Sequence, residues 1–234
     1  MISVAVVTYN GERYLKEQLD SILANLKAED EVVVSDDGSS DGTWNILQQY
    51  REQDDRVHIK KGPGQGVIAN VEYVLSCCRG DYIFLADQDD VWMPDKVERV
   101  MAVMKAQEAV LVVHDARVMD ADCREVIMPS FFDYRHSGRG AVKNMVKNTY
   151  MGCCMAFSRE VLSCVLPIPK DIPMHDQWIG VKCDLKYRRT VFLKEQLICY
   201  RRHGGNVSDF SHNWVGTMIK NRLIFLKGIL ISNG

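Results

Sequence analysis

The most constraining feature of the sequence is a regular alternation, over its first ninety residues, of short β-branched runs with longer segments of helical period. We expect strands at residues 2–7, 31–35, 57–60 and 82–86. Between them, apolar residues recur every three to four positions, which is typical of amphipathic helices. Strands that alternate with helices build a mostly parallel sheet. The sequence therefore predicts an α/β fold with a central, mostly parallel sheet flanked by helices.

The elements that follow are less regular. Asp41 is expected to be the N-cap of a helix through Tyr50, because its carboxylate can accept an unpaired backbone N–H. Pro94 is expected in the first turn of another helix, which leads to a fifth strand at 109–113. We expect residues 115–170 to be irregular. A helix after His175 and a strand from Thr190 to Cys199 should then complete the domain.

Length and composition are those of one sizeable globular domain, or of one domain with a short appendage. The 234 residues are 47% hydrophobic and 26% charged, and the net charge of −2 gives no footprint for nucleic acid. Eight cysteines include two adjacent pairs but no CxxC spacing, which argues against a zinc site. We expect a cytoplasmic protein with reduced cysteines.

Three polar clusters follow predicted strands: Thr8-Tyr9-Asn10-Gly11, Asp36-Asp37-Gly38-Ser39 and Asp87-Gln88-Asp89-Asp90. Any one of them could simply make turns and helix caps. All three should nevertheless meet, because ligands of open α/β sheets bind at the carboxyl ends of the strands. The third cluster holds three carboxylates, whose mutual repulsion a hard cation would offset. Mg²⁺ or Mn²⁺ prefers such oxygen ligands, so the clusters predict a metal and diphosphate site.

These segments, together with Gly80-Asp81-Tyr82-Ile83 and His175-Asp176, resemble the family-2 glycosyltransferases of the GT-A fold in order and spacing. The Asp-Gln-Asp-Asp-x-Trp run and the later Tyr200-Arg201-Arg202-His203 are most similar to rhamnosyltransferase-like bacterial members, which build cell-surface polysaccharides. The resemblance implies a GT-A catalytic domain over residues 1–212. It also implies a hexosyltransferase, with rhamnose, galactose, glucose and their derivatives all open as donor sugars.

The resemblance further implies a nucleotide-binding set. Thr8 and Tyr9 match the segment that lines the nucleotide-base pocket, and Asp37 matches the carboxylate that binds a uracil or thymine ring N–H. Asp87 and Asp89 match the paired aspartates around the diphosphate, with Asp89 as the direct metal ligand. UDP- and dTDP-sugars are the donors that this set implies.

The remaining implied residues belong to the metal and acceptor sides. His203 lies where some members place a further metal or diphosphate contact. Gly152 matches the segment beside the donor sugar and acceptor, with His175 beside it. Asp176 matches the catalytic base. An ordinary loop histidine at 203 and a simple helix start at 176 are the alternative interpretations of these two residues.

The implied chemistry is also reasonable from the residues. A bound metal can stabilise a departing diphosphate, and a carboxylate on the opposite face can take the proton of an attacking hydroxyl. One in-line displacement then inverts the anomeric centre. Two rivals stay open: a nucleotidyltransferase, although residues 8–13 are a poor triphosphate loop, and a non-catalytic nucleotide-sugar-binding module.

The last segment, 213–234, is predicted to form a basic amphipathic helix. Apolar Trp214, Met218, Leu223, Leu226 and Leu230 alternate there with Lys220, Arg222 and Lys227. Such a helix can lie on an anionic membrane surface, which suits a saccharide acceptor on a lipid anchor. Packing against the catalytic domain is the equal alternative. We therefore expect a peripheral protein at the inner face of the cell membrane, whose natural chain could extend further.

Overall fold

The N-terminal half of the sheet is parallel, as the sequence predicts. The computed structural model describes residues 1–206 and 215–232. Four of its strands, β1 (Ile2–Thr8), β2 (Glu31–Asp36), β3 (Val57–Lys61) and β4 (Tyr82–Ala86), lie in the order β3-β2-β1-β4 and pair in parallel. Their carboxyl ends therefore meet at one edge.

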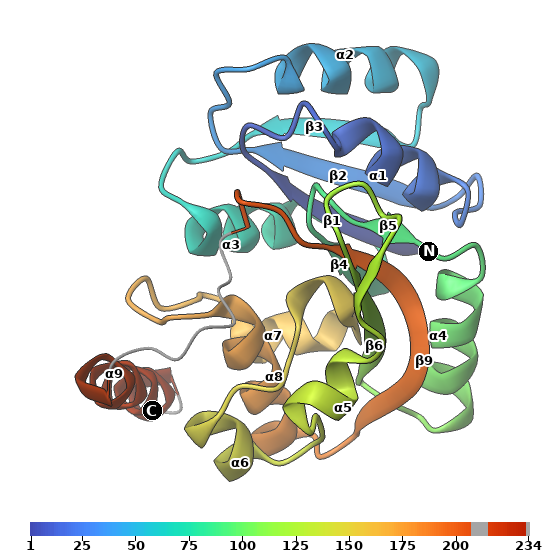
Figure 1. Ribbon diagram of the computed structural model, residues 1–234. Helices are drawn as coiled ribbons and strands as arrows, with labels where there is room; N and C mark the ends of the chain where they lie inside the picture. The colour runs from blue at the N-terminus through green and yellow to red at the C-terminus, as the bar shows by residue number, and fades with distance from the viewer. Residues whose placement is uncertain (207–214, 233–234) are drawn as a thin grey trace.

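Helices cover both faces of these strands. They are α1 (Leu15–Leu23), α2 (Thr43–Gln53) and α3 (Val67–Cys77), whereas α4 (Lys96–Ala106) packs on the second half of the sheet. In Figure 1, α2 lies on one side of β2 and β3 and α3 lies on the other. The apolar residues that predicted α1 face inward, because Leu15, Leu19 and Ile22 are fully buried.

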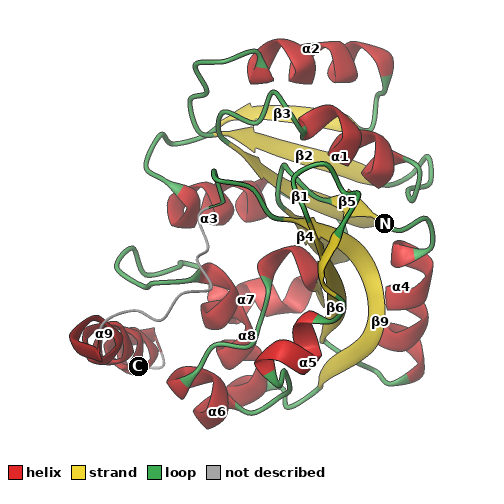
Figure 2. Ribbon diagram, in the orientation of Figure 1, coloured by secondary structure: helices red, strands yellow, loops and turns green. Residues whose placement is uncertain are grey.

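The second half of the sheet is mixed. Strand β8 (Met155–Ser158) runs antiparallel between β4 and β6 (Leu111–Met119), and β6 pairs in parallel with β9 (Thr190–Arg201). Two short strands, β5 (Val91–Trp92) and β7 (Val126–Met128), join β9 and β6 respectively, both antiparallel. Figure 2 shows the long β9 curving along this half of the sheet.

The segment expected to be irregular, 115–170, proved to be structured, and that expectation was wrong. Besides β8, β7 and the far end of β6, it contains several short helices. These are α5 (Phe131–Arg135), α6 (Ala141–Val146), α7 (Leu162–Val165) and the 3₁₀ turns Gly152–Cys154 and Arg159–Val161. Helix α8 (His175–Lys186) begins at His175, where the sequence places its start.

Two expected helix starts shift by a few residues. Helix α2 begins at Thr43 with Gly42 as its N-cap, so Asp41 lies one position before the cap. Its carboxylate still accepts the Thr43 backbone N–H at 3.0 Å. Pro94 precedes α4 by two residues and lies in the turn before it, outside the first helical turn.

Helix α9 (Val215–Ser232) packs one side against the domain. The Phe225 ring is buried edge-to-face on Trp178 of α8, with centroids 5.9 Å apart. Gly228 allows this approach, since a Cβ there would lie 3.3 Å from the Trp178 ring. Residues 213 and 214, the predicted start of this helix with Trp214, lie outside the described residues. In the described parts of the chain, no helix has the length and apolar character needed to cross a membrane.

Candidate functional site

The three polar clusters of the sequence meet at the carboxyl ends of β1, β2 and β4. The backbone N–H of Asp37 donates to the Thr8 carbonyl at 2.9 Å, and the Thr8 hydroxyl donates to Gln88 Oε1 at 2.5 Å. The Gln88 side chain also accepts the Tyr9 N–H and donates to the Tyr9 carbonyl. Gln88 thus joins the loops after β1 and β4, a role that sequence reasoning missed because it needs the pairing of distant loops.

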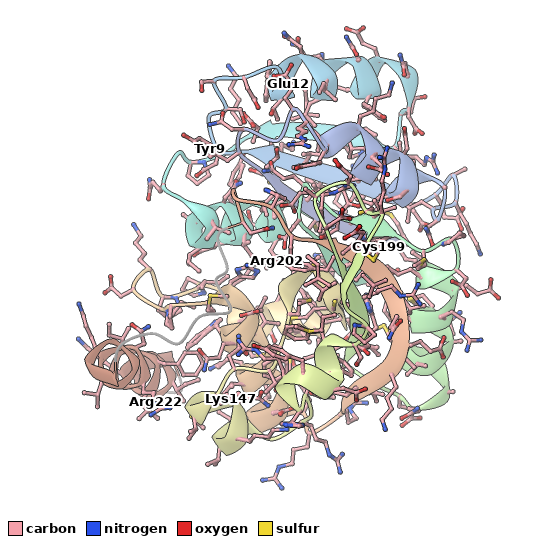
Figure 3. All side chains as sticks on the ribbon, in the orientation of Figure 1. Tyr9, Glu12, Lys147, Cys199, Arg202 and Arg222 are labelled. Carbon is pink, nitrogen blue, oxygen red and sulfur yellow. The ribbon has the colours of Figure 1, made fainter. Side chains whose placement is uncertain are left out.

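Asp37 organises a glycine-rich loop. Its two carboxylate oxygens accept the backbone N–H groups of Gly64 at 2.8 Å and Gly66 at 2.7 Å. Both glycines have positive φ, at +66° and +89°, which explains why this loop needs glycine. Tyr9, on the loop after β1, is 58% exposed (Figure 3). A carboxylate and an exposed aromatic ring therefore adjoin this edge of the sheet.

Asp89 and His203 lie together although 114 residues separate them. The Asp89 Oδ2 atom is 2.7 Å from His203 Nε2, and the Asn206 side-chain amide donates to the same oxygen at 3.3 Å. The His203 ring lies on Tyr14, with centroids 4.7 Å apart. The residues predicted as metal ligands are thus neighbours, joined by the curved strand β9.

Arg201 holds the acidic loop in place and was not among the predicted site residues. Its buried guanidinium donates to the Asp89 carbonyl at 2.8 Å, to the Ala121 carbonyl at 2.7 Å and to Glu17 at 2.6 Å. Its backbone N–H donates to Asp90 Oδ1 at 3.1 Å. The arginine doublet before His203 was the available sequence signal, but its contacts depend on how β9 curves.

Asp87 lies between the Asp89 and His203 pair and the start of α8. Burial raises the pKa of the Asp87 carboxyl to about 6, and the negative charges of Asp89 and Asp176 add to the shift, while His175 opposes it. A carboxylate oxygen of Asp87 also lies within 4.8 Å of the Cys153 sulfur, and the adjacent Gly152 lies against His175 and Asp176. The loop after β4 and the start of α8 are therefore near one another.

Asp176 is buried at the first turn of α8. Its Oδ1 accepts the Gln177 backbone N–H at 2.6 Å and the Asn148 side-chain amide at 3.0 Å. Burial raises the pKa of its carboxyl to about 6, although these two hydrogen bonds lower it. Asn148, which sequence reasoning missed, fixes the orientation of this carboxylate.

Gly152 makes room for the start of α8. A Cβ at position 152 would lie 2.7 Å from His175 Nε2 and 3.7 Å from Asp176 Cβ. Burial lowers the pKa of His175, and Asp87 partly offsets this effect. The three residues predicted for the donor and acceptor side are therefore in close contact.

A second group of possible ligands joins two residues of the acidic loop to Cys153. Ligand atoms of Asp87, Asp90 and Cys153 all lie within 4.8 Å of one another. Burial and the charge of Asp89 raise the pKa of Asp90 well above its usual range, and the Cys153 thiol pKa is also raised well above normal. Sulfur is a soft ligand, whereas Mg²⁺ and Mn²⁺ prefer oxygen ligands. Asp90 and Cys153 therefore fit a structural role better than a site for these ions.

The chemistry of the Asp89 and His203 donor set fits a divalent cation. A carboxylate and one imidazole, with Asp87 close by, suit Mn²⁺ or Mg²⁺. Because Asp89 Oδ2 and His203 Nε2 share a hydrogen bond, an ion would replace that bond. Arg201 fixes the Asp89 backbone and the Tyr14 ring packs on the His203 ring, so the pair is pre-oriented.

Known proteins match both the sequence and the fold. The model of the family described as Glycosyl transferase family 2 matches residues 3–166. An uncharacterized glycosyltransferase of Nostoc sp. is 29% identical over 215 residues, which cover 88% of this chain and 66% of that protein. A putative teichuronic acid biosynthesis glycosyltransferase of Bacillus subtilis is 28% identical over 163 residues, covering 65% of this chain and 60% of the relative.

Solved structures give the same result for the fold. S. aureus TarS in complex with UDP-GlcNAc superimposes with a TM-score of 0.76 at 18% identity, covering 98% of this chain and 66% of that one. A mannosyltransferase from Pyrobaculum calidifontis, in complex with GDP-Man and Mn²⁺, has a TM-score of 0.69 at 19% identity, covering 88% and 58%. The chain has the GT-A fold, and it spans 60% to 66% of the length of the two curated relatives.

Proposed function

The chain belongs to glycosyl transferase family 2, and from this premise we propose that it is an inverting, metal-dependent glycosyltransferase. Its donor is a UDP- or dTDP-sugar, and its acceptor is a hydroxyl of a saccharide or lipid-linked saccharide. One observation carries the proposal: a carboxylate oxygen of Asp87 lies within 4.8 Å of the Cys153 sulfur, and the adjacent Gly152 lies against His175 and Asp176, so the metal and base candidates border one space. A nucleotide sugar and an acceptor could therefore meet between them.

The nucleotide side of the proposal rests on the loops after β1 and β2. Tyr9 offers an exposed ring for stacking, and Thr8 lies beside it. The Asp37 carboxylate accepts two backbone N–H groups and has lone pairs left for a pyrimidine N–H. The UDP-GlcNAc complex of TarS, which shares the fold, supports a nucleotide-sugar donor.

The metal side consists of Asp89 and His203, with Asp87 beside the diphosphate. When bound, Mg²⁺ or Mn²⁺ would supply Lewis-acid stabilisation of the departing nucleoside diphosphate. Arg201 keeps the Asp89 backbone fixed, and Tyr14 fixes the His203 ring. The Mn²⁺ complex of the mannosyltransferase supports this cofactor.

Asp176 is the proposed general base. A carboxyl with a pKa of about 6 is ionised at neutral pH, yet it is a stronger base than an ordinary aspartate. Asn148 directs the carboxylate, and Gly152 lets the 3₁₀ turn approach it closely. With the base opposite the leaving group, a single displacement inverts the anomeric carbon without a protein nucleophile.

A relative named for teichuronic acid biosynthesis supports a role in cell-surface polysaccharide synthesis. We further propose that the protein acts at the cytoplasmic face of the cell membrane, in peripheral contact with it and with lipid-linked acceptors. Nucleic acid is not among its proposed partners.

The test is a screen of UDP- and dTDP-sugars with the full chain and Mn²⁺, in which both nucleoside diphosphate and pyrophosphate are measured. Nucleoside diphosphate release is expected. Pyrophosphate release would instead indicate a nucleotidyltransferase, and binding without turnover would indicate a non-catalytic module.

Two substitutions assign the roles. Asp176→Asn should abolish transfer and leave UDP binding intact, whereas Asp171→Asn, an exposed aspartate before the same helix, should leave both unchanged. Asp89→Asn should weaken UDP binding only in the presence of metal. Full transfer by Asp176→Asn would exclude it as the base.

A further inference from the structure

Helices α6 and α9 lie side by side and form one outer surface. Two guanidinium N–H groups of Arg222 donate to the Val146 carbonyl, at 3.2 and 2.8 Å. Figure 3 shows Arg222 next to Lys147, the residue that follows α6. We call the exposed residues of these two helices, together with Lys147 and the half-buried Arg222, the α6–α9 surface. Its members are Val142, Lys143, Val146, Lys147, Lys220, Arg222, Leu223, Leu226 and Lys227.

This surface exposes four large apolar side chains. Val142 and Val146 are 73% and 56% exposed, and they are four residues apart on the same side of α6. Leu223 and Leu226 are 62% and 44% exposed, three residues apart on α9. Single exposed apolar residues are ordinary, but an apolar group on two adjoining helices with a basic border marks an interaction surface.

The charge on the surface has one sign. Residues 139–149 and 215–232 contain basic residues but no aspartate or glutamate, in a chain whose net charge is −2. Exposed lysines at 143, 147, 220 and 227 surround the apolar side chains. Leucine and valine bordered by lysine is the composition of a surface that enters the headgroup region of an anionic bilayer.

We propose that the α6–α9 surface docks on an anionic lipid bilayer, and that α6 is as much a part of the contact as α9. A second copy of the chain is a poor occupant, because a self-paired interface would bring lysines together. An anionic bilayer neutralises the lysines and buries the valines and leucines at the same time.

The docked orientation would bring the bilayer near the proposed base. The inner side of α6 is tied to α8, since the Gln177 side-chain amide donates to the Asn144 carbonyl at 2.7 Å. Asn148, which directly follows Lys147, donates to Asp176. A lipid-linked acceptor would then present its hydroxyl on the same side as Asp176. The docking deepens the peripheral membrane contact proposed above, and this last step rests on the proposed glycosyl transfer as well.

The test is cosedimentation of the full chain with vesicles. Binding is expected to phosphatidylglycerol/phosphatidylcholine vesicles but not to phosphatidylcholine alone, and it should weaken as salt is added. Leu223→Asp/Leu226→Asp and, separately, Val142→Asp/Val146→Asp should each lower the vesicle partition coefficient at least about tenfold. Ile127→Asp, at an equally exposed apolar residue of β7, is the matched control and should bind like the wild type.

The outcomes separate this proposal from the enzymatic one. The docking variants and the Ile127→Asp control should keep the wild-type thermal midpoint and the wild-type rate of donor hydrolysis without vesicles. Asp176→Asn, in contrast, should lose transfer yet still bind vesicles. Failure of the α6 pair to reduce binding would overturn the role of α6. Equal binding to neutral vesicles, no vesicle binding, or a dimer that the same substitutions dissociate would overturn lipid docking.

Discussion

A single methyl group at position 152 tests how closely the 3₁₀ turn approaches the start of α8. Gly152 has no positive φ, so alanine is allowed by the backbone and only the available space opposes it. The new Cβ would lie 2.7 Å from His175 Nε2, whereas ordinary contacts begin near 3.4 Å. The imidazole or the turn must therefore move by about 0.7 Å. Overpacking of this kind costs about 1–3 kcal/mol of unfolding free energy.

Gly152→Ala should affect transfer more than binding. A displacement of about 1 Å beside reacting groups can lower a rate about 100-fold, so we expect kcat to fall about 10- to 100-fold. UDP affinity, measured by calorimetry, should stay unchanged because Thr8 and Asp37 lie on other loops. Gly138→Ala is the control, since its Cβ would meet only the flexible end of Lys143. Wild-type kcat and stability in Gly152→Ala would refute the close approach.

Three further predictions follow from buried groups. The transfer rate should fall as pH drops below about 6, because protonated Asp176 cannot accept a proton, and a pH–rate profile without this acid limb would argue against it as the base. Arg201→Met should lower the free energy of unfolding by about 3 kcal/mol in urea titrations, since the Asp89 and Ala121 carbonyls lose their buried donor; an unchanged urea midpoint would contradict this. Burial and nearby Lys96 hold the pKa of His114 well below its usual range. As pH falls below about 6.5, His114 therefore becomes protonated in the unfolded chain but stays neutral in the folded protein. The free energy of unfolding of the wild type should therefore fall by up to about 1.4 kcal/mol per pH unit relative to that of His114→Asn in this range. Parallel plots of unfolding free energy against pH for the two proteins would contradict this prediction.

The parallel strands could be predicted because each carries its own signal. β-branched runs such as Val32 to Val34 are buried on both faces of a parallel sheet and stand out in the sequence. The polar residues that end these strands could then be assigned to one edge from topology alone. The contacts among Thr8, Asp37 and Gln88 confirm that they meet there.

The second half of the sheet carries weaker local signals. Strand β8 reads Met-Ala-Phe-Ser, without a β-branched residue, and it lies between 3₁₀ turns. It forms because β4 and β6 leave a gap that its backbone fills with antiparallel pairs. This information is tertiary, so no periodicity in residues 115–170 could reveal it.

The residues that support the site could not be predicted either, because their contacts are also tertiary. Gln88, Arg201 and Asn148 act by hydrogen bonds to residues at least 28 positions away in sequence. Their residue types are common in loops and strand ends, and nothing local marks them. The roles of the predicted site residues themselves stay predictions, although the structure places Asp89 against His203, and Gly152 against His175 and Asp176.

The most direct measurement of the central claim is the anomalous scattering of Mn²⁺ in crystals grown with UDP. The account predicts one peak bound by Asp89 and His203 and by the diphosphate, with the uracil ring beside Asp37 and Asp176 facing the open side of the diphosphate. Mn²⁺ bound elsewhere, or UDP bound at this edge without any metal peak, would contradict it.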